Sequence, residues 1–105
     1  MTYLNEIREL IATPTPADTE PLLERLDETL TTGYANALQL EAARWRIERR
    51  IGEVAAEVGE GDDTVRVEEL ATLARSLREA NEEITALRSL LASLRDRRRA
   101  LRTAA

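Results

Sequence analysis

Five arginines near the C-terminus are the residues best suited to binding chemistry. They lie within residues 95–102 and are Arg95, Arg97, Arg98, Arg99 and Arg102. Guanidinium groups gathered in this way can bind the phosphates of a nucleic acid or another anionic surface. The stretch also ends a predicted helix, where cations stabilise the negative end of the helix dipole. We therefore treat it as a candidate partner-binding basic end, although pairing with acidic residues of the same chain is the favoured explanation. Those residues are Asp18, Glu20, Glu24, Asp27 and Glu28.

The overall charge weighs against nucleic acid as the main ligand of this end. The chain carries 15 basic and 20 acidic residues, for a formal net charge of −5. Binding to a phosphate backbone depends on an excess of basic charge. Nucleic acid is consequently an unlikely partner, and the basic end favours internal charge pairing or a protein partner.

Catalytic and metal-binding chemistry is excluded largely by the residues that the chain lacks. It has no cysteine and no histidine, which removes thiolate nucleophiles, the commonest acid–base group and the usual zinc ligands. The adjacent pairs Glu68-Glu69 and Glu82-Glu83 point to different sides of a helix and do not converge. Gly59-x-Gly61 lacks the lysine of a phosphate-binding loop. We predict no enzyme activity and no catalytic residue, cofactor or metal site.

The elements that carry these residues are predicted by an apolar repeat in the C-terminal third. Apolar residues recur there in alternating steps of three and four, with one interruption at Arg98, a spacing that places a narrow seam along one helix. The seam is formed by Leu70, Leu73, Leu77, Ala80, Ile84, Leu87, Leu91, Leu94 and Leu101. Ala, Glu, Leu and Arg together supply 62 of the 105 residues, a composition typical of long or coiled-coil helices.

Prolines and glycines divide the chain into a single helical domain of five segments. We predict a short helix over 2–12, a proline-containing linker over 13–18, a long helix over 19–58, a turn over 59–63 and a second long helix over 64–103. The turn is too short for the long helices to run parallel. The predicted fold is all-α, an antiparallel two-helix coiled-coil hairpin with a short N-terminal helix, completed as a bundle by oligomerisation.

The turn also fixes which residues of the two long helices face each other. If Val58 meets Val65, then Leu40 faces Ile84, Ala37 faces Leu87 and Leu30 faces Leu94. Gly33 then lies opposite Leu90 and Leu91, where its missing side chain gives the leucines room. Arg44 interrupts the seam near Ala80, and we expect it either to pair at the edge with glutamates or to fix the register. The glutamates within reach are Glu79, Glu82 and Glu83.

Two uncharged stretches predict where the hairpin is covered by further helices. Residues 29–40 carry no charge, and residues 84–94 carry only Arg88. Tyr34, Leu38 and Trp45 flank the seam on one side of the first long helix, and we regard them as a candidate self-association surface. The helix 2–12 is expected to fold back near the open end of the hairpin, beside Leu22 and Leu90. The alternative is that both flanks belong to one three-helix core.

These patterns favour a non-enzymatic structural or adaptor protein that acts through helix–helix interaction and self-association. The expected partners are the chain itself, as a homodimer or tetramer, and another protein. The first alternative is a small helical chaperone or regulatory subunit that binds a partner helix. The second is a nucleic-acid-associated protein that uses the arginine-rich end. The sequence contains no segment apolar enough to span a membrane and no secretion signal, so we expect a cytoplasmic protein.

Overall fold

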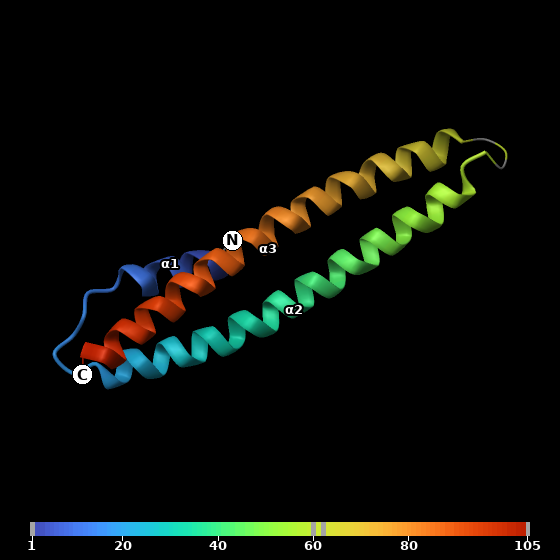
Figure 1. The fold of residues 1–105 in the computed structure, drawn as a ribbon. Coiled ribbons are helices and arrows are strands. Elements are labelled where there is room, and N and C mark those ends of the chain that lie inside the picture. The colour runs from blue at the N-terminus through green and yellow to red at the C-terminus, as the bar shows by residue number, and fades with distance from the viewer. Residues whose placement is uncertain (1, 60, 62, 105) are drawn as a thin grey trace. The chain divides into compact units, whose positions relative to one another are not determined.

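Three helices make up nearly all of the structure, a computed structural model that describes residues 2–59, 61 and 63–104. They are α1 (Thr2–Ala12), α2 (Glu20–Glu57) and α3 (Thr64–Ala104), and the described residues form no strand. The predicted all-α class is confirmed, because α2 and α3 form a helical hairpin preceded by a short helix (Figure 1). Completion of the hairpin as a bundle by oligomerisation stays a prediction.

The helices begin and end within one residue of the predicted positions because local groups cap them. At the start of α2, the Asp18 carboxylate accepts a hydrogen bond from the Glu20 amide at 3.2 Å, and the Thr19 carbonyl accepts one from Leu23. Asp63 serves both sides of the turn. Its carboxylate accepts the Gly59 amide at 2.7 Å and its carbonyl accepts the Val67 amide. These bonds satisfy backbone groups that helix ends leave unpaired.

Glycine is required within the predicted turn by backbone conformation. Gly59 and Gly61 have φ angles of 99° and 100°, a region that residues with a Cβ rarely adopt. Glu60 and Asp62, which belong to the predicted turn over 59–63, lie outside the described residues.

The chain divides into two compact units, each of which takes part of α2 and part of α3. Unit 1 comprises Met1–Ala37 and Thr85–Ala105, and unit 2 comprises Leu38–Ile84. Unit 1 therefore contains α1 together with the start of α2 and the end of α3. Unit 2 contains the rest of α2 and α3 and the turn between them.

Unit 1 has a core to which all three helices contribute. α1 lies alongside the C-terminal part of α3, drawn in red in Figure 1. The buried apolar residues of this unit are Ile7, Leu10, Leu22, Leu26, Leu30, Ala37, Leu87, Leu91, Leu94 and Leu101. Burying a leucine or isoleucine side chain contributes about 1.5–3 kcal/mol, so this cluster is the main source of stability in unit 1.

The packing of α1 confirms that the helix 2–12 folds back onto the hairpin. The Tyr3 hydroxyl donates a hydrogen bond to the Thr29 carbonyl at 3.2 Å. A Cβ added to Gly33 would overlap Leu91 Cδ2 and lie 3.0 Å from the Tyr3 hydroxyl oxygen. The predicted contact between Gly33 and Leu91 is therefore present, and Tyr3 occupies the same gap. In unit 1, α1 therefore covers one side of the uncharged stretch, at Thr29 and Gly33. The other side of this stretch stays exposed, at Thr31, Thr32, Tyr34 and Ala35.

Tyr3 gives unit 1 a predicted sensitivity to alkaline pH. Burial raises the pKa of its phenol above the ordinary value of 10.0, the nearby Glu6 carboxylate raises it further, and a hydrogen bond with Asn36 opposes both. A raised folded-state pKa means that ionisation favours the unfolded chain. Stability from Tyr3 is thus complete below pH 10 and is lost as pH rises through the folded-state value.

This effect can be isolated because the chain has two tyrosines and no lysine, histidine or cysteine. We expect wild type to lose stability in urea unfolding as the pH rises above 10, and Tyr3→Phe to lose less. Tyrosinate absorbance should show the Tyr3 transition above pH 10 in folded protein only. An equal alkaline loss in both proteins would contradict the assignment.

Unit 2 is a two-helix arm whose seam is only partly covered. Val54 and Ile84 are the buried apolar residues in the described part of this unit. Most seam positions are half-buried, as expected when two helices shield each other on one side only. They are Leu40, Ile47, Ile51, Leu70, Leu73 and Leu77. Val58 and Val65, predicted to meet across the turn, are 40% and 68% exposed, so neither is buried at the end of the arm.

Polar contacts across unit 2 agree with the predicted antiparallel register. Arg44 donates to the Asn81 side chain at 3.3 Å, one residue from the predicted position beside Ala80. Its ionic partner is Glu48 on its own helix, at 3.5 Å. The expected pairing of Arg44 with glutamates of α3 is therefore replaced by an amide contact and an i,i+4 pair within α2.

Candidate interaction surfaces

Arg97 holds the end of α1 to α3 within unit 1. Its guanidinium donates to the carbonyl oxygens of Leu10, at 3.2 Å, Ile11 and Thr13. Leu10 and Ile11 belong to the last turn of α1, whose carbonyl groups lack partners within the helix. A guanidinium has a fork of donors that suits several acceptors at once. Arg97 is thus a C-terminal cap for α1 supplied by another helix.

The other arginines of the basic end differ in how far they are engaged. Arg98 pairs with the Asp27 carboxylate, one of the internal partners expected from the sequence. Arg99 lies 3.9 Å from Asp96 in an exposed pair, which contributes little. Arg95 and Arg102 are exposed. The charges of Arg97 and Arg98 are therefore engaged by other groups of unit 1. The charge that this end presents to solvent lies on Arg95, Arg99 and Arg102.

We predict that Arg97→Ala destabilises the chain while Arg95→Ala does not. Losing charged hydrogen bonds from a half-buried guanidinium should cost about 1.5 kcal/mol, and the freed carbonyls should let α1 fray. Arg95 is exposed, so its loss should change stability by less than about 0.5 kcal/mol. Urea unfolding and amide hydrogen exchange of residues 3–12 measure both effects. Equal stability of the two variants would contradict the capping role.

The predicted self-association residues are all exposed. Tyr34, in unit 1, is 40% exposed. In unit 2, Leu38 is 66% and Trp45 59% exposed. Leu38 and Trp45 are seven residues apart and so share one side of α2. The Arg49 guanidinium carbon lies 5.6 Å from the centre of the Trp45 ring, a cation–π distance. Even with this contact, more than half of the tryptophan surface remains uncovered.

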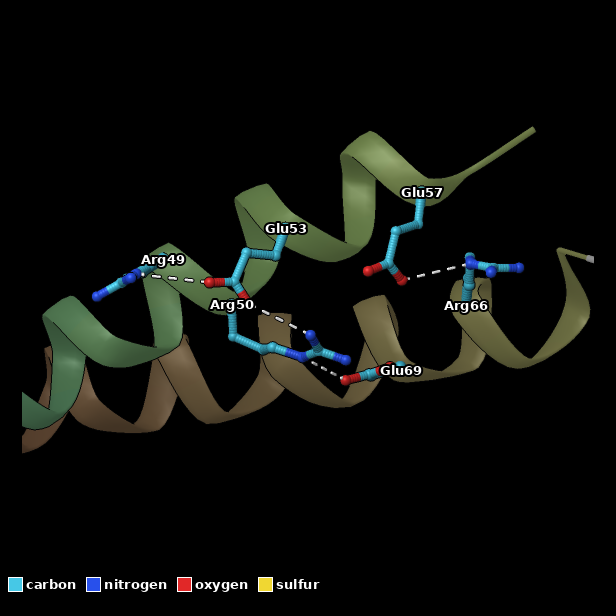
Figure 2. A network of polar contacts seen from close by, with 6 residues as sticks. All are labelled: Arg49, Arg50, Glu53, Glu57, Arg66 and Glu69. Atoms are coloured by element: carbon cyan, nitrogen blue, oxygen red, sulfur yellow. Dashed lines mark hydrogen bonds and ion pairs between the residues drawn. The ribbon is translucent and has the colours of Figure 1, made fainter. Parts of the chain in front are cut away.

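Ion pairs near the turn hold the two helices of unit 2 together, as Figure 2 shows. Arg50 reaches from α2 to Glu69 of α3 at 2.9 Å and also pairs with Glu53 at 3.3 Å. Arg66 of α3 pairs with Glu57 at 3.5 Å. The pKa of the Arg50 guanidinium is raised, first by its hydrogen bond to Glu69, then by its hydrogen bond to Glu53 and by the charges of Glu69 and Glu57. The two pairs that join α2 to α3 are part-buried, whereas the Arg50–Glu53 pair within α2 is exposed and contributes little to stability.

The described parts of the chain contain no group of three or more side chains able to hold a metal ion, and no buried side-chain nitrogen or oxygen among them lacks a hydrogen-bond partner. An open pocket of about 540 Å³ lies beside Ile11, Pro14 and Leu101. The one charged residue that lines this pocket is Arg97, whose guanidinium already donates hydrogen bonds to carbonyl oxygens of α1. None of the described helices contains a stretch that could cross a lipid bilayer.

Arg97 is the residue whose role sequence reasoning missed. The basic cluster was identified, but its central member binds carbonyl oxygens and not an anion. Only the position of α1 against α3 reveals this role, and no local pattern around Arg97 encodes it. Comparison of the chain with models of protein families, with curated proteins and with solved structures found no match.

Proposed function

We propose that this protein is a non-enzymatic structural or adaptor protein that acts through helix–helix contacts and self-association. The observation that carries the proposal is the exposure of Leu38 and Trp45 on one side of α2 in unit 2. Large apolar side chains gathered on an exposed helix face are typical of sites that another protein covers. Tyr34, in unit 1, is 40% exposed and is the candidate self-association residue of that unit.

The half-buried seam of unit 2 supports the same proposal. A two-helix arm buries less apolar surface per residue than a three-helix core, so additional helices packed against it would stabilise it. The arm is also charge-rich on its remaining faces, which keeps the rest of its surface soluble. We place recognition on the side of α2 that carries Leu38 and Trp45; the other exposed large apolar residues of the described part of unit 2 lie at or near the turn, and they are Val58, Val65 and Val67.

Light scattering during gel filtration at micromolar concentration tests the proposal. We expect wild type to elute as a dimer or tetramer, and the double variant Leu38→Glu/Trp45→Glu to elute as a helical monomer. Arg75→Glu is the matched control, because it alters an exposed residue of α3 in unit 2 and changes the net charge by the same amount. It should associate as wild type does.

A monomeric wild type would overturn self-association. If that monomer also bound an apolar dye, the result would support the alternative of a small chaperone or regulatory subunit, whose apolar face stays open for a partner helix.

A further inference from the structure

The two glycines of α2 have opposite surroundings. The space that a side chain at Gly33 would occupy is filled by Leu91 and Tyr3. A Cβ added to Gly52 would meet nothing within 4 Å, and Gly52 is exposed. A glycine inside a helix costs about 1 kcal/mol relative to alanine. Packing within unit 1 accounts for Gly33, whereas no contact within the described chain accounts for Gly52.

Gly52 lies on the same side of α2 as Leu38 and Trp45, the exposed large apolar residues of that helix in unit 2. Steps of four and three residues lead from Leu38 to Gly52 and beyond, which keeps every position on one helix face. All of these positions are exposed. We call this face the outer strip, and its members are Leu38, Ala42, Trp45, Arg49, Gly52 and Ala56.

The charge of unit 2 favours a second copy of the chain as the occupant of the outer strip. The α2 residues 38–57 contain four arginines and four glutamates, and Arg49 pairs with Glu53 at 3.5 Å. An identical copy therefore meets no net repulsion there. The α3 residues 64–84 contain three arginines and five glutamates. Two copies approaching through α3 would repel each other.

The surface area that a stable dimer must bury indicates how far the contact extends along α2. A tryptophan and a leucine left mostly uncovered expose on the order of 200 Å² together, whereas a stable interface covers about 600–1,000 Å² of each partner. The exposed area of Leu38 and Trp45 alone is too small for a stable interface, so a stable contact must also cover the rest of the outer strip along α2. Small residues at Ala42, Gly52 and Ala56 allow two helix backbones to approach closely over that length.

We propose that α2 of a second copy packs antiparallel along the outer strip, an inference that rests on the self-association proposed above. In this arrangement Ala42 faces Gly52 of the second copy, and Leu38 faces its Ala56. Trp45 lies beside Arg49 of the second copy. The contact is two-fold symmetric, so each pair occurs twice.

The antiparallel direction follows from the distribution of large and small residues. A parallel pair would bring Trp45 against Trp45 and Gly52 against Gly52, which crowds one layer and leaves another empty. The antiparallel pair places the leucine over alanine and lets the glycine accommodate the opposing backbone. The Gly52 position, which costs stability in the isolated chain, becomes the point of closest approach.

Cysteine cross-linking tests the direction without interference, because the chain has no native cysteine. We expect Ala42→Cys/Gly52→Cys to form a disulfide-linked dimer on mild oxidation. These positions are about 15 Å apart along one helix, too far for a disulfide within one chain. Ala42→Cys and Gly52→Cys alone should give little covalent dimer. Ala71→Cys, on an exposed α3 position, is the control and should give none.

The outcomes separate this inference from the proposed function. Efficient cross-linking of either single variant would indicate a parallel pair and overturn the inference. Wild type that is dimeric by light scattering while the double variant fails to cross-link would overturn it and leave self-association standing. A monomeric wild type would overturn both. Gly52→Leu provides a check free of oxidation: it should weaken association at least tenfold with unchanged helical content, and unchanged association would contradict the close approach.

Discussion

Gly33→Leu is expected to lower the free energy of unfolding by about 3 kcal/mol, near the upper end of the usual cost of overpacking. Even a Cβ at this position overlaps Leu91 and crowds the Tyr3 hydroxyl, and Leu91 is itself buried. Three helices of unit 1 meet at this layer, so a leucine must push one of them away. Urea unfolding followed by circular dichroism measures the change.

Gly52→Ala is the control for this prediction and should change stability in the opposite direction. An added methyl group at Gly52 meets nothing, and alanine is the better helix former by up to about 1 kcal/mol. The unfolding free energies of the two variants should be compared at a concentration where the chain is monomeric, so that changes in association do not affect them. An unchanged or higher stability of Gly33→Leu would show that the Gly33–Leu91 layer is not closely packed.

Leu94→Ala is expected to cost about 2–5 kcal/mol, the usual range for emptying a leucine site in a core. Leu94 is completely buried in unit 1, whereas Leu38 is 66% exposed in unit 2. Leu38→Ala is therefore the matched control, with a change below about 0.5 kcal/mol in the monomer. Similar losses in the two variants would contradict the core assignment.

The apolar repeat predicted the helices and their register well because both follow from local spacing. Helix ends fall within one residue of the predicted positions, since prolines, glycines and Asp63 act on the backbone beside them. The contact of Gly33 with Leu91 followed once the short turn required an antiparallel hairpin. The exposure of Leu38 and Trp45 followed from their place beside the seam.

Side-chain partners that depend on packing between helices could not be predicted from the sequence. Arg97 was identified as part of a basic surface, yet its acceptors are carbonyl groups that become neighbours only after α1 docks. Arg44 was expected beside glutamates and instead contacts Asn81, because several acceptors lie within reach of one flexible side chain. The open space around Gly52 likewise could not be predicted, because a glycine in a helix does not indicate which residues pack against it.

The emission spectrum of Trp45, the one tryptophan of the chain, measured across a dilution series, tests the central claim that a second protein chain covers the exposed face of α2. Its 59% exposure predicts emission at long wavelength in the dilute monomer. The emission maximum should move to shorter wavelength as concentration rises, with a midpoint that coincides with the gain in mass by light scattering. A maximum that stays at long wavelength while the mass increases would place the contact elsewhere and contradict the account.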